Sequence, residues 1–247
     1  MRKISIELVP RHTADLLAEM QLVRQHFPSI DTTNIPDLLK FRIRSWEACR
    51  QARDYFSHAI PHLRAIDFDL RHPLPLQDML GNSGIDTVLV IAGDQPQDMS
   101  RRTYRTSSVE MIRALKKQMP ELKVFAGIDP YRCGFREELD YVKRKVDAGA
   151  DGFFTQPFFD LRLLCIWHDQ LQNLDIFWGV TPVTSQRSRD YWENLNQAVF
   201  PADFQPTLAW NRRFAETALA FARQADASLY FMPIRVDLVA YLSGLLD

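Results

Sequence analysis

Cysteine is scarce in this sequence, and its spacing fits neither a disulfide framework nor a metal ribbon. The three cysteines, Cys49, Cys133 and Cys165, lie far apart, and no two of them form a C-x-x-C pair. An odd, scattered set argues against disulfide bonding and against a zinc ribbon. We therefore expect three reduced, structural thiols in a cytoplasmic protein.

The sequence also lacks long hydrophobic runs and an excess of charge of one sign. Glu7 stands where a signal peptide needs its apolar core, and no later apolar run is long enough to span a bilayer. The 30 basic and 31 acidic residues are interleaved and give a formal charge of -1. Such a balance offers no electrostatic footprint for nucleic acid or an anionic membrane. A small-molecule partner is therefore expected.

The commonest catalytic and nucleotide-binding motifs are missing as well. The sequence has no H-E-x-x-H, G-x-S-x-G, Walker loop or G-x-G-x-x-G. A doubly wound sheet would need a glycine-rich first turn, but the turn here reads Val9-Pro10-Arg11. These absences argue against the usual hydrolase, metalloprotease and dinucleotide-fold interpretations.

Short apolar runs instead alternate with helical patterns along the chain. Eight runs read as strands, at residues 3–8, 29–34, 62–66, 87–92, 122–127, 152–156, 174–180 and 228–232. Helical patterns lie between most of them, which is typical of βα units on a parallel sheet. Because 247 residues without a linker can share one core, we predict an α/β fold: a single-domain (β/α)8 TIM barrel over residues 1–247.

The seventh predicted unit is irregular. It contains helical patterns near residues 188–199 and 210–224, separated by a loop with Pro201 and Pro206. A closing helix is expected after Arg235.

The segment from Lys143 to Asp160 is the most informative part of the chain. Leu139, Val142 and Val146 recur at helical spacing, and Gly149 follows where a left-handed capping residue would sit. The helix should therefore end at this glycine and lead directly into a strand.

The strand that follows ends in polar and aromatic residues. It runs from Gly152 to Gln156, and Phe158 and Phe159 come just after it. Residues past the carboxyl ends of barrel strands line the active-site face, so Gln156 and the two phenylalanines are candidate ligand contacts. An ordinary barrel strand with an aromatic core explains the segment equally well.

The first strand brings an acid into the predicted barrel. Its aliphatic residues alternate with Ser5 and Glu7, so these two should point inward if the aliphatic set packs on the helices. A buried carboxylate must be paired, hydrogen-bonded or neutral. Glu7 is therefore a candidate general acid, and a structural ion pair with an inward Arg or Lys is the alternative.

Further polar residues are expected on the same rim. Asp94 follows a very apolar strand and the small pair Ala92-Gly93, which allows close approach of a ligand. A helix cap or turn would explain Asp94 as well. Asp31, Thr33, Asn34 and Asp129 stand at the ends of other predicted strands.

Two histidines have the spacing of a helical metal site. His58 and His62 are four residues apart, but Pro61 would interrupt a helix between them. We expect His62 to open a strand, as a core residue or as a ligand contact, and we expect no metal site.

Several short motifs together resemble the methylenetetrahydrofolate reductase family. They are Ser5-Ile6-Glu7-Leu8-Val9-Pro10, His62-Leu63, Gly93-Asp94-Gln95-Pro96, the run from Leu139 to Ala150, and Thr155-Gln156-Pro157-Phe158-Phe159-Asp160. Their order and spacing match along nearly the whole chain. The segment from Lys143 to Asp160 is the specific part of the resemblance.

The resemblance implies a barrel in which a noncovalent FAD takes a hydride from NAD(P)H and passes it to 5,10-methylenetetrahydrofolate. Glu7 matches the residue that protonates a folate nitrogen, and Asp94 matches one that contacts the pterin near the flavin. Gln156 matches a contact to folate and nicotinamide. Phe158 and Arg235 complete the predicted substrate contacts.

The resemblance also implies flavin contacts from Thr33, His62, Arg144 and Lys145, together with Asp94. Several positions depart from the family pattern, including the residues after the fifth strand, Ile128-Asp129-Pro130-Tyr131-Arg132, and the loop Asn34-Ile35-Pro36-Asp37 after the second. Ala92 stands where the family has an arginine before the Gly-Asp pair, and Tyr141 replaces an asparagine that faces the adenosine side.

We therefore predict a cytoplasmic methylenetetrahydrofolate reductase-like oxidoreductase whose partners are reduced folate and NAD(P)H. The departures leave three alternatives open. These are a flavin-free member, a noncatalytic or partner-dependent folate-binding subunit, and an unrelated barrel lyase or methyltransferase. A homo-oligomer or a complex with a partner subunit fits the sequence equally well.

Overall fold

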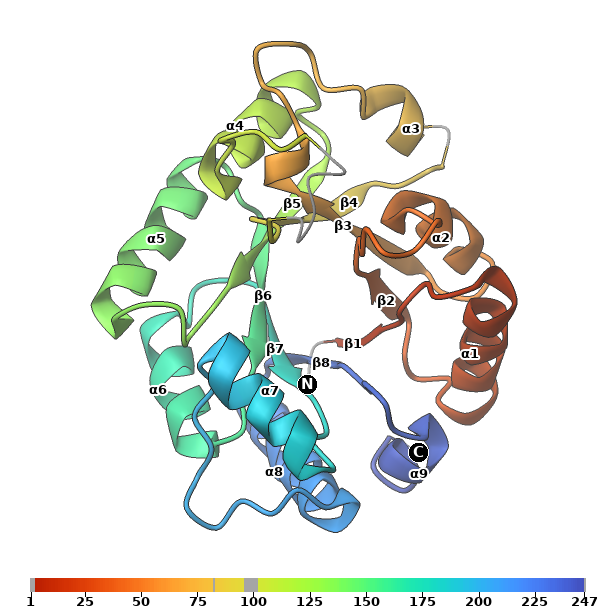
Figure 1. The fold of residues 1–247 in the computed structure, drawn as a ribbon, viewed down its shortest axis with the longest axis vertical. Coiled ribbons are helices and arrows are strands. Elements are labelled where there is room, and N and C mark those ends of the chain that lie inside the picture. Colours follow the sequence, from red (N-terminus) through yellow and green to blue (C-terminus); the bar gives the residue numbers. More distant parts are fainter. Residues whose placement is uncertain (1–2, 82, 96–101, 247) are drawn as a thin grey trace.

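The computed structural model describes residues 3–81, 83–95 and 102–246, and these form a closed parallel barrel with surrounding helices. Strands β1 to β8 follow one another around the barrel in chain order, and β8 pairs with β1 to close it. Figure 1 shows the strands at the centre and the helices around them. The predicted (β/α)8 TIM barrel is confirmed.

The elements have the following bounds. The strands are β1 (Ile4–Glu7), β2 (Thr32–Ile35), β3 (His58–Arg64), β4 (Thr87–Ile91), β5 (Lys123–Ile128), β6 (Gly152–Pro157), β7 (Ile176–Val180) and β8 (Ser228–Phe231). The α-helices are α1 (Thr13–His26), α2 (Ser45–Ala52), α3 (Gln77–Gly81), α4 (Ser108–Gln118), α5 (Phe135–Asp147), α6 (Leu161–Gln170), α7 (Gln186–Asn196), α8 (Leu208–Gln224) and α9 (Leu238–Leu242). Within the described ranges, no helix has the length and apolar character needed to cross a membrane.

Two strands lie elsewhere than predicted. The third begins at His58 instead of His62, because the barrel accommodates Pro61 inside the strand, where it pairs with Ile35 of β2. Proline is usually found at the end of a strand or outside it, so the start of the third strand was predicted after Pro61. The second begins at Thr32 instead of residue 29, since Ser29 belongs to a turn.

The helix α5 ends as predicted, just before Gly149, and it buries Val142 together with Lys145. Gly149 has a φ of 105° just after the helix, and a Cβ there would lie 2.9 Å from Lys116 Cγ. The left-handed conformation and the close approach both require glycine. Val146, however, is 37 % exposed, whereas Lys145 is buried.

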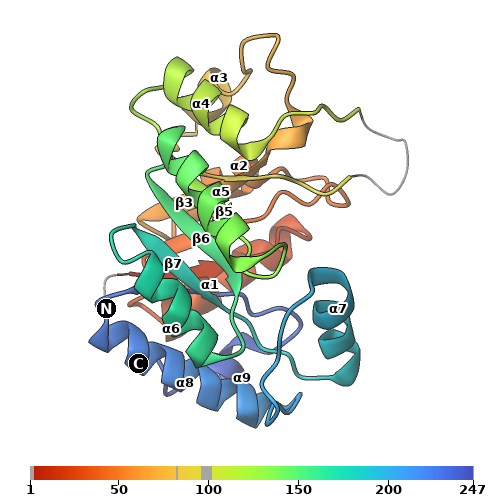
Figure 2. The same cartoon turned by 90° about the vertical axis from the view of Figure 1, so that its left-hand side faces the viewer.

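The seventh unit contains both predicted helices. Ser185 caps α7 by accepting a hydrogen bond from the Ser188 amide, and Thr207 caps α8 by accepting one from the Trp210 amide. Figure 2 shows α7 at the same end of the barrel as the segment that leaves β4. The additional helix therefore stands beside the carboxyl ends of the strands.

One half of the barrel interior is aromatic. Phe154 stacks on Phe177 with ring centroids 4.5 Å apart and meets Tyr230 edge-on at 5.2 Å. Phe125 of β5 contacts Phe177 of β7, and because these strands are not neighbours in the sheet, the rings meet inside the barrel. A Cβ on Gly179 would lie 2.8 Å from the Tyr230 ring, so glycine makes room for it.

The other half of the interior is polar. Ser5 pairs in register with the inward Tyr230, and Glu7 pairs with Asn34, so these residues share the inner face. Thr33 then faces the helices, and its hydroxyl donates to the Ile6 carbonyl at 2.9 Å. The predicted inward direction of Ser5 and Glu7 is confirmed by this register.

Candidate active site

Glu7 is a nearly buried carboxyl at the carboxyl end of β1. Its side chain is 10 % exposed. Burial raises the pKa of Glu7 to about 7, and the hydrogen bond from Asn34 opposes that rise. The protonated form of this group is therefore populated near neutral pH, which suits a general acid.

Asn34 connects the polar residues of three neighbouring strands. Its Nδ2 donates to Glu7 Oε2 at 3.0 Å and lies 3.1 Å from His62 Nε2. Its Oδ1 accepts from Ser5 Oγ at 2.8 Å. The Asn34 amide thus joins Ser5, Glu7 and His62, and this fixes the direction of the Glu7 carboxyl.

His62 is a neutral partner in this cluster. It is buried, and loss of solvent lowers its pKa to about 3. Because Asn34 Nδ2 is a donor, His62 Nε2 accepts from it and Nδ1 carries the proton. His62 Nε2 lies 3.9 Å from Glu7 Oε2, so Glu7 faces an uncharged ring and its carboxylate gains no ion pair here.

The pair His58 and His62 cannot share a metal ion. Both belong to β3, where four residues span about 13 Å. His58 is exposed, whereas His62 is buried inside the barrel. Among the described residues, no three His, Cys, Asp or Glu side chains gather as metal ligands.

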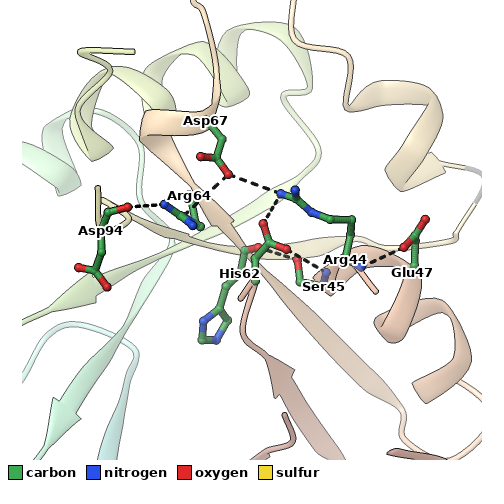
Figure 3. Close-up of polar contacts among 8 residues, drawn as sticks. Arg44, Ser45, Glu47, His62, Arg64, Asp67 and Asp94 are labelled. Carbon is green, nitrogen blue, oxygen red and sulfur yellow. Dashed lines mark hydrogen bonds and ion pairs between the residues drawn. The ribbon is translucent and has the colours of Figure 1, made fainter. Parts of the chain in front are cut away.

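Asp94 lies just after β4 and is exposed. Its backbone carbonyl accepts a hydrogen bond from Arg64 Nη2. Figure 3 shows the Asp94 carboxylate pointing away from that guanidinium, on the side where the His62 ring lies. The carboxylate is thus available to a ligand. Pro96, which ends the Gly93–Pro96 motif, lies outside the described residues.

The two predicted contacts from the sixth strand behave differently. Gln156 is half-buried near the end of β6. Phe158 is fully buried, with its ring against Trp178 at 5.8 Å and Tyr131 at 6.4 Å. Phe158 therefore packs in the core and presents no surface to a substrate, and Gln156 stays the candidate contact of this strand.

Arg235 occupies the segment after β8. It is exposed and has a φ of 56°, in the left-handed region that non-glycine residues seldom adopt. Its role as a substrate contact stays a prediction.

Of the two flavin contacts predicted on α5, Lys145 is bonded to protein atoms and Arg144 is exposed. Lys145 is buried, its Nζ donates to the Gly127 carbonyl at 2.5 Å, and it lies 3.9 Å from Glu138 Oε1. Burial lowers the pKa of Lys145 to about 8, which the charge of Glu138 opposes. Arg144 is exposed and lies over the Tyr141 ring at 5.1 Å.

These residues do not fit a flavin as the structure arranges them. Thr33 faces the helix layer, and Lys145 is bonded to protein atoms between α5 and β5. The Lys145 ammonium also lies 3.9 Å from the centre of the Tyr141 ring, at the position where the resemblance implied an asparagine. Of the five predicted contacts, Thr33 and Lys145 are therefore unavailable, whereas His62 and Asp94 belong to the site and Arg144 is exposed on α5.

Two residues of the site were not predicted as such. The sequence predicts Asn34 only as a polar rim residue, and it predicts the neighbouring Thr33 as a flavin contact. Arg64 was not singled out, although it follows His62 by two residues and so shares its face of β3. The inward–outward alternation of these strands, counted from His62 and Glu7, is the signal that could have found both.

The comparisons with known proteins agree with the resemblance. A sequence profile described as methylenetetrahydrofolate reductase matches residues 12–217. The 5,10-methylenetetrahydrofolate reductase of Escherichia coli is 24 % identical over 149 residues, covering 58 % of this chain and 50 % of that protein. Methylenetetrahydrofolate reductase 2 of Saccharomyces cerevisiae is 28 % identical over 128 residues, covering 44 % and 21 %. The chain thus spans about half the length of the bacterial relative.

Solved structures share the fold. A 2,3-dimethylmalate lyase gives a TM-score of 0.57 at 12 % identity and covers 95 % of this chain and 75 % of its own. An oxaloacetate acetylhydrolase gives 0.55 at 11 % identity, covering 94 % and 75 %. At such identities the likeness concerns the barrel alone. Because the family profile covers most of the sequence, the chain belongs to the methylenetetrahydrofolate reductase family.

Proposed function

We propose that the protein reduces 5,10-methylenetetrahydrofolate to 5-methyltetrahydrofolate with NAD(P)H in the cytoplasm, and that Glu7 is the general acid. The observation that carries this proposal is the carboxyl inside the barrel, whose pKa burial raises to about 7. A general acid is most effective when its pKa lies near the working pH. Membership of the family supplies the substrate class.

The proposed reaction consumes one proton and one hydride. Glu7 gives its proton to the folate nitrogen whose bond to the methylene carbon then breaks, which leaves an iminium ion. The hydride from the dihydronicotinamide ring forms a bond to that methylene carbon and completes the methyl group. NAD(P)⁺ is released, and solvent returns a proton to Glu7. Asn34, which is itself bonded to His62, holds the carboxyl in place during these steps.

Asp94 and Gln156 are proposed to orient the folate. Both lie at or just past the carboxyl end of a barrel strand, the face on which barrel enzymes place their active sites. Asp94 presents an exposed carboxylate suited to the N–H donors of a pterin ring. Gln156 is half-buried and offers both a donor and an acceptor to folate or nicotinamide.

The proposed reaction does not pass through a flavin, because Thr33 faces the helices and Lys145 is already bonded to the Gly127 carbonyl. The purified protein, mixed with FAD and then desalted, should show no flavin absorption bands in stoichiometric amount. Free FAD carried through the same column is the control. A stoichiometric flavin spectrum would contradict this part of the proposal.

The function itself is tested with the isolated chain. NADH or NADPH oxidation should depend on added 5,10-methylenetetrahydrofolate, and chromatography should show an equal amount of 5-methyltetrahydrofolate. Heat-denatured protein is the control. Tight binding of reduced folate without nucleotide oxidation would overturn the proposal and favour the partner-dependent folate-binding subunit.

A further inference from the structure

Arg64 is a nearly buried cation at the mouth of the barrel, and the proposed reaction does not yet use it. It ends β3, two residues after His62 and on the same face of the strand. Its side chain is only 8 % exposed. A buried guanidinium is costly unless it is paired and hydrogen-bonded, so its partners indicate what it is there to hold.

The closest partner of Arg64 is the backbone that carries Asp94. Arg64 Nη2 donates to the Asp94 carbonyl. The preceding residue, Gly93, has a φ of 88°, and a Cβ there would lie 2.9 Å from Arg64 Nε and 3.0 Å from Ile66 Cγ1. The Arg64 side chain therefore packs directly against the turn, and glycine is required for that approach.

Arg64 is itself held by a chain of charges from two other loops. Its Nε lies 3.8 Å from Asp67 Oδ2, and the same oxygen lies 3.5 Å from Arg44 Nη2. Arg44 also forms an ion pair with the buried Asp37. Figure 3 shows these groups as a continuous row that ends at Asp94. The segments after β2, β3 and β4 are thereby connected.

The network is also joined to the strand that carries His62. The Asp37 carboxylate accepts from the Ser45 amide at 3.3 Å, and Ser45 Oγ donates to the His62 carbonyl at 2.7 Å. The candidate acid cluster and the Asp94 turn therefore share one rigid support. Coupled networks of this kind hold a side chain more precisely than any single contact does.

The position of Arg64 also accounts for a departure in the sequence. Ala92 stands where an arginine was expected before the Gly-Asp pair. Arg64 brings a guanidinium to the same Gly93–Asp94 backbone from the neighbouring strand β3. The turn is thus held by a cation on another strand.

We propose that Arg64 is the positioning residue that fixes the Asp94 turn for folate, supported by Asp67 and Arg44. This inference rests on the proposed function, because Asp94 matters to catalysis only if it binds the folate. Arg64 acts through the Asp94 backbone and not by contact with the reacting atoms.

The kinetic test compares Arg64→Met, Arg64→Lys and Asp94→Asn with a matched control, Arg71→Met. Arg71 pairs with Asp69 on the surface, and its side chain is 73 % exposed. Arg64→Met should lower kcat/KM for the folate by up to about 100-fold, as a misplaced catalytic group does. The KM for NAD(P)H should not change. Arg64→Lys should recover part of the loss, and Arg71→Met should match the wild type.

A double variant shows whether Arg64 acts through Asp94. Arg64→Met combined with Asp94→Asn should be little worse than the poorer single variant, because both remove the same interaction. If the double variant loses kcat/KM by the full product of the two single losses, the proposal is overturned. An unchanged kcat/KM for the folate in Arg64→Met would overturn it as well.

Hydrogen exchange tests the positioning without relying on catalysis. In the full-length Arg64→Met protein, the amides of residues 92–95 should exchange faster, while those of β6 should keep the wild-type rate. Unchanged exchange at residues 92–95 would overturn the proposal whatever the activity. Faster exchange in a protein whose wild type reduces no folate would support the positioning role and refute the proposed function alone.

Discussion

Replacing Glu7 with glutamine should lower the turnover number for folate reduction about 100- to 10,000-fold, the range that a lost general acid costs. Glutamine keeps the size of the side chain and can still bond to Asn34, but it has no acidic proton to give. The dissociation constant for reduced folate should therefore stay close to that of the wild type. Single-turnover kinetics and equilibrium binding measure the two quantities separately.

The matched control for this experiment is Glu19→Gln. Glu19 lies on α1, half-buried outside the barrel and paired with Arg11 at 3.8 Å. The same acid-to-amide change at this position should leave turnover at the wild-type level. Normal turnover in Glu7→Gln, or an equal loss in both variants, would remove Glu7 from the mechanism.

The same Glu7→Gln change should also alter how the stability of the protein depends on pH. Burial raises the pKa of Glu7 from 4.5 to about 7, so between these values the folded protein holds a proton that the unfolded chain has released. In that window stability falls as the pH rises. The shift corresponds to about 3 kcal/mol of unfolding free energy, fully lost above pH 7.

Glutamine cannot ionise and should be free of this penalty. The unfolding free energy of Glu7→Gln relative to the wild type should therefore rise by up to about 3 kcal/mol between roughly pH 4.5 and pH 8. Urea unfolding across this range measures the difference. Glu216→Gln, on the exposed side of α8, is the control and should give a flat difference. A flat difference for Glu7→Gln would show that its carboxyl ionises normally in the folded state.

The barrel could be predicted from the sequence because it depends on local patterns that repeat. Apolar runs of strand length and helical spacing recur along the chain, and Gly149 marks the end of α5 as expected. The departures arose where one residue carried a misleading local signal. Pro61 suggested a boundary inside β3, yet the sheet accommodates it next to Ile35.

The site was only partly predictable, because its geometry depends on strand register. A shift of one residue turns a side chain to the other face of the sheet. The sequence therefore predicts a ligand contact at Thr33, although Asn34 is the residue that faces the interior. The hydrogen bond from Asn34 to Glu7 was not predicted. The direction of Glu7 was correct because the alternation of the first strand is regular.

Contacts between distant parts of the chain were beyond reach of the sequence. Arg64 and Asp94 are 30 residues apart, and nothing in the composition of either segment indicates that they touch. Lys145 is a predicted flavin contact, but it is buried and bonded to the Gly127 carbonyl of β5. Long side chains can bury their stems and choose among several partners, so local pattern does not determine where their charge lies.

The dependence of kcat/KM for 5,10-methylenetetrahydrofolate on pH tests the central claim most directly. This ratio reports the ionisation of groups in the free enzyme. If protonated Glu7 is the acid, kcat/KM should be level below about pH 7 and fall about tenfold per pH unit above it, and this decline should be absent from the residual activity of Glu7→Gln. A rate that stays level or rises to about pH 9, or a decline that persists in Glu7→Gln, would contradict the account.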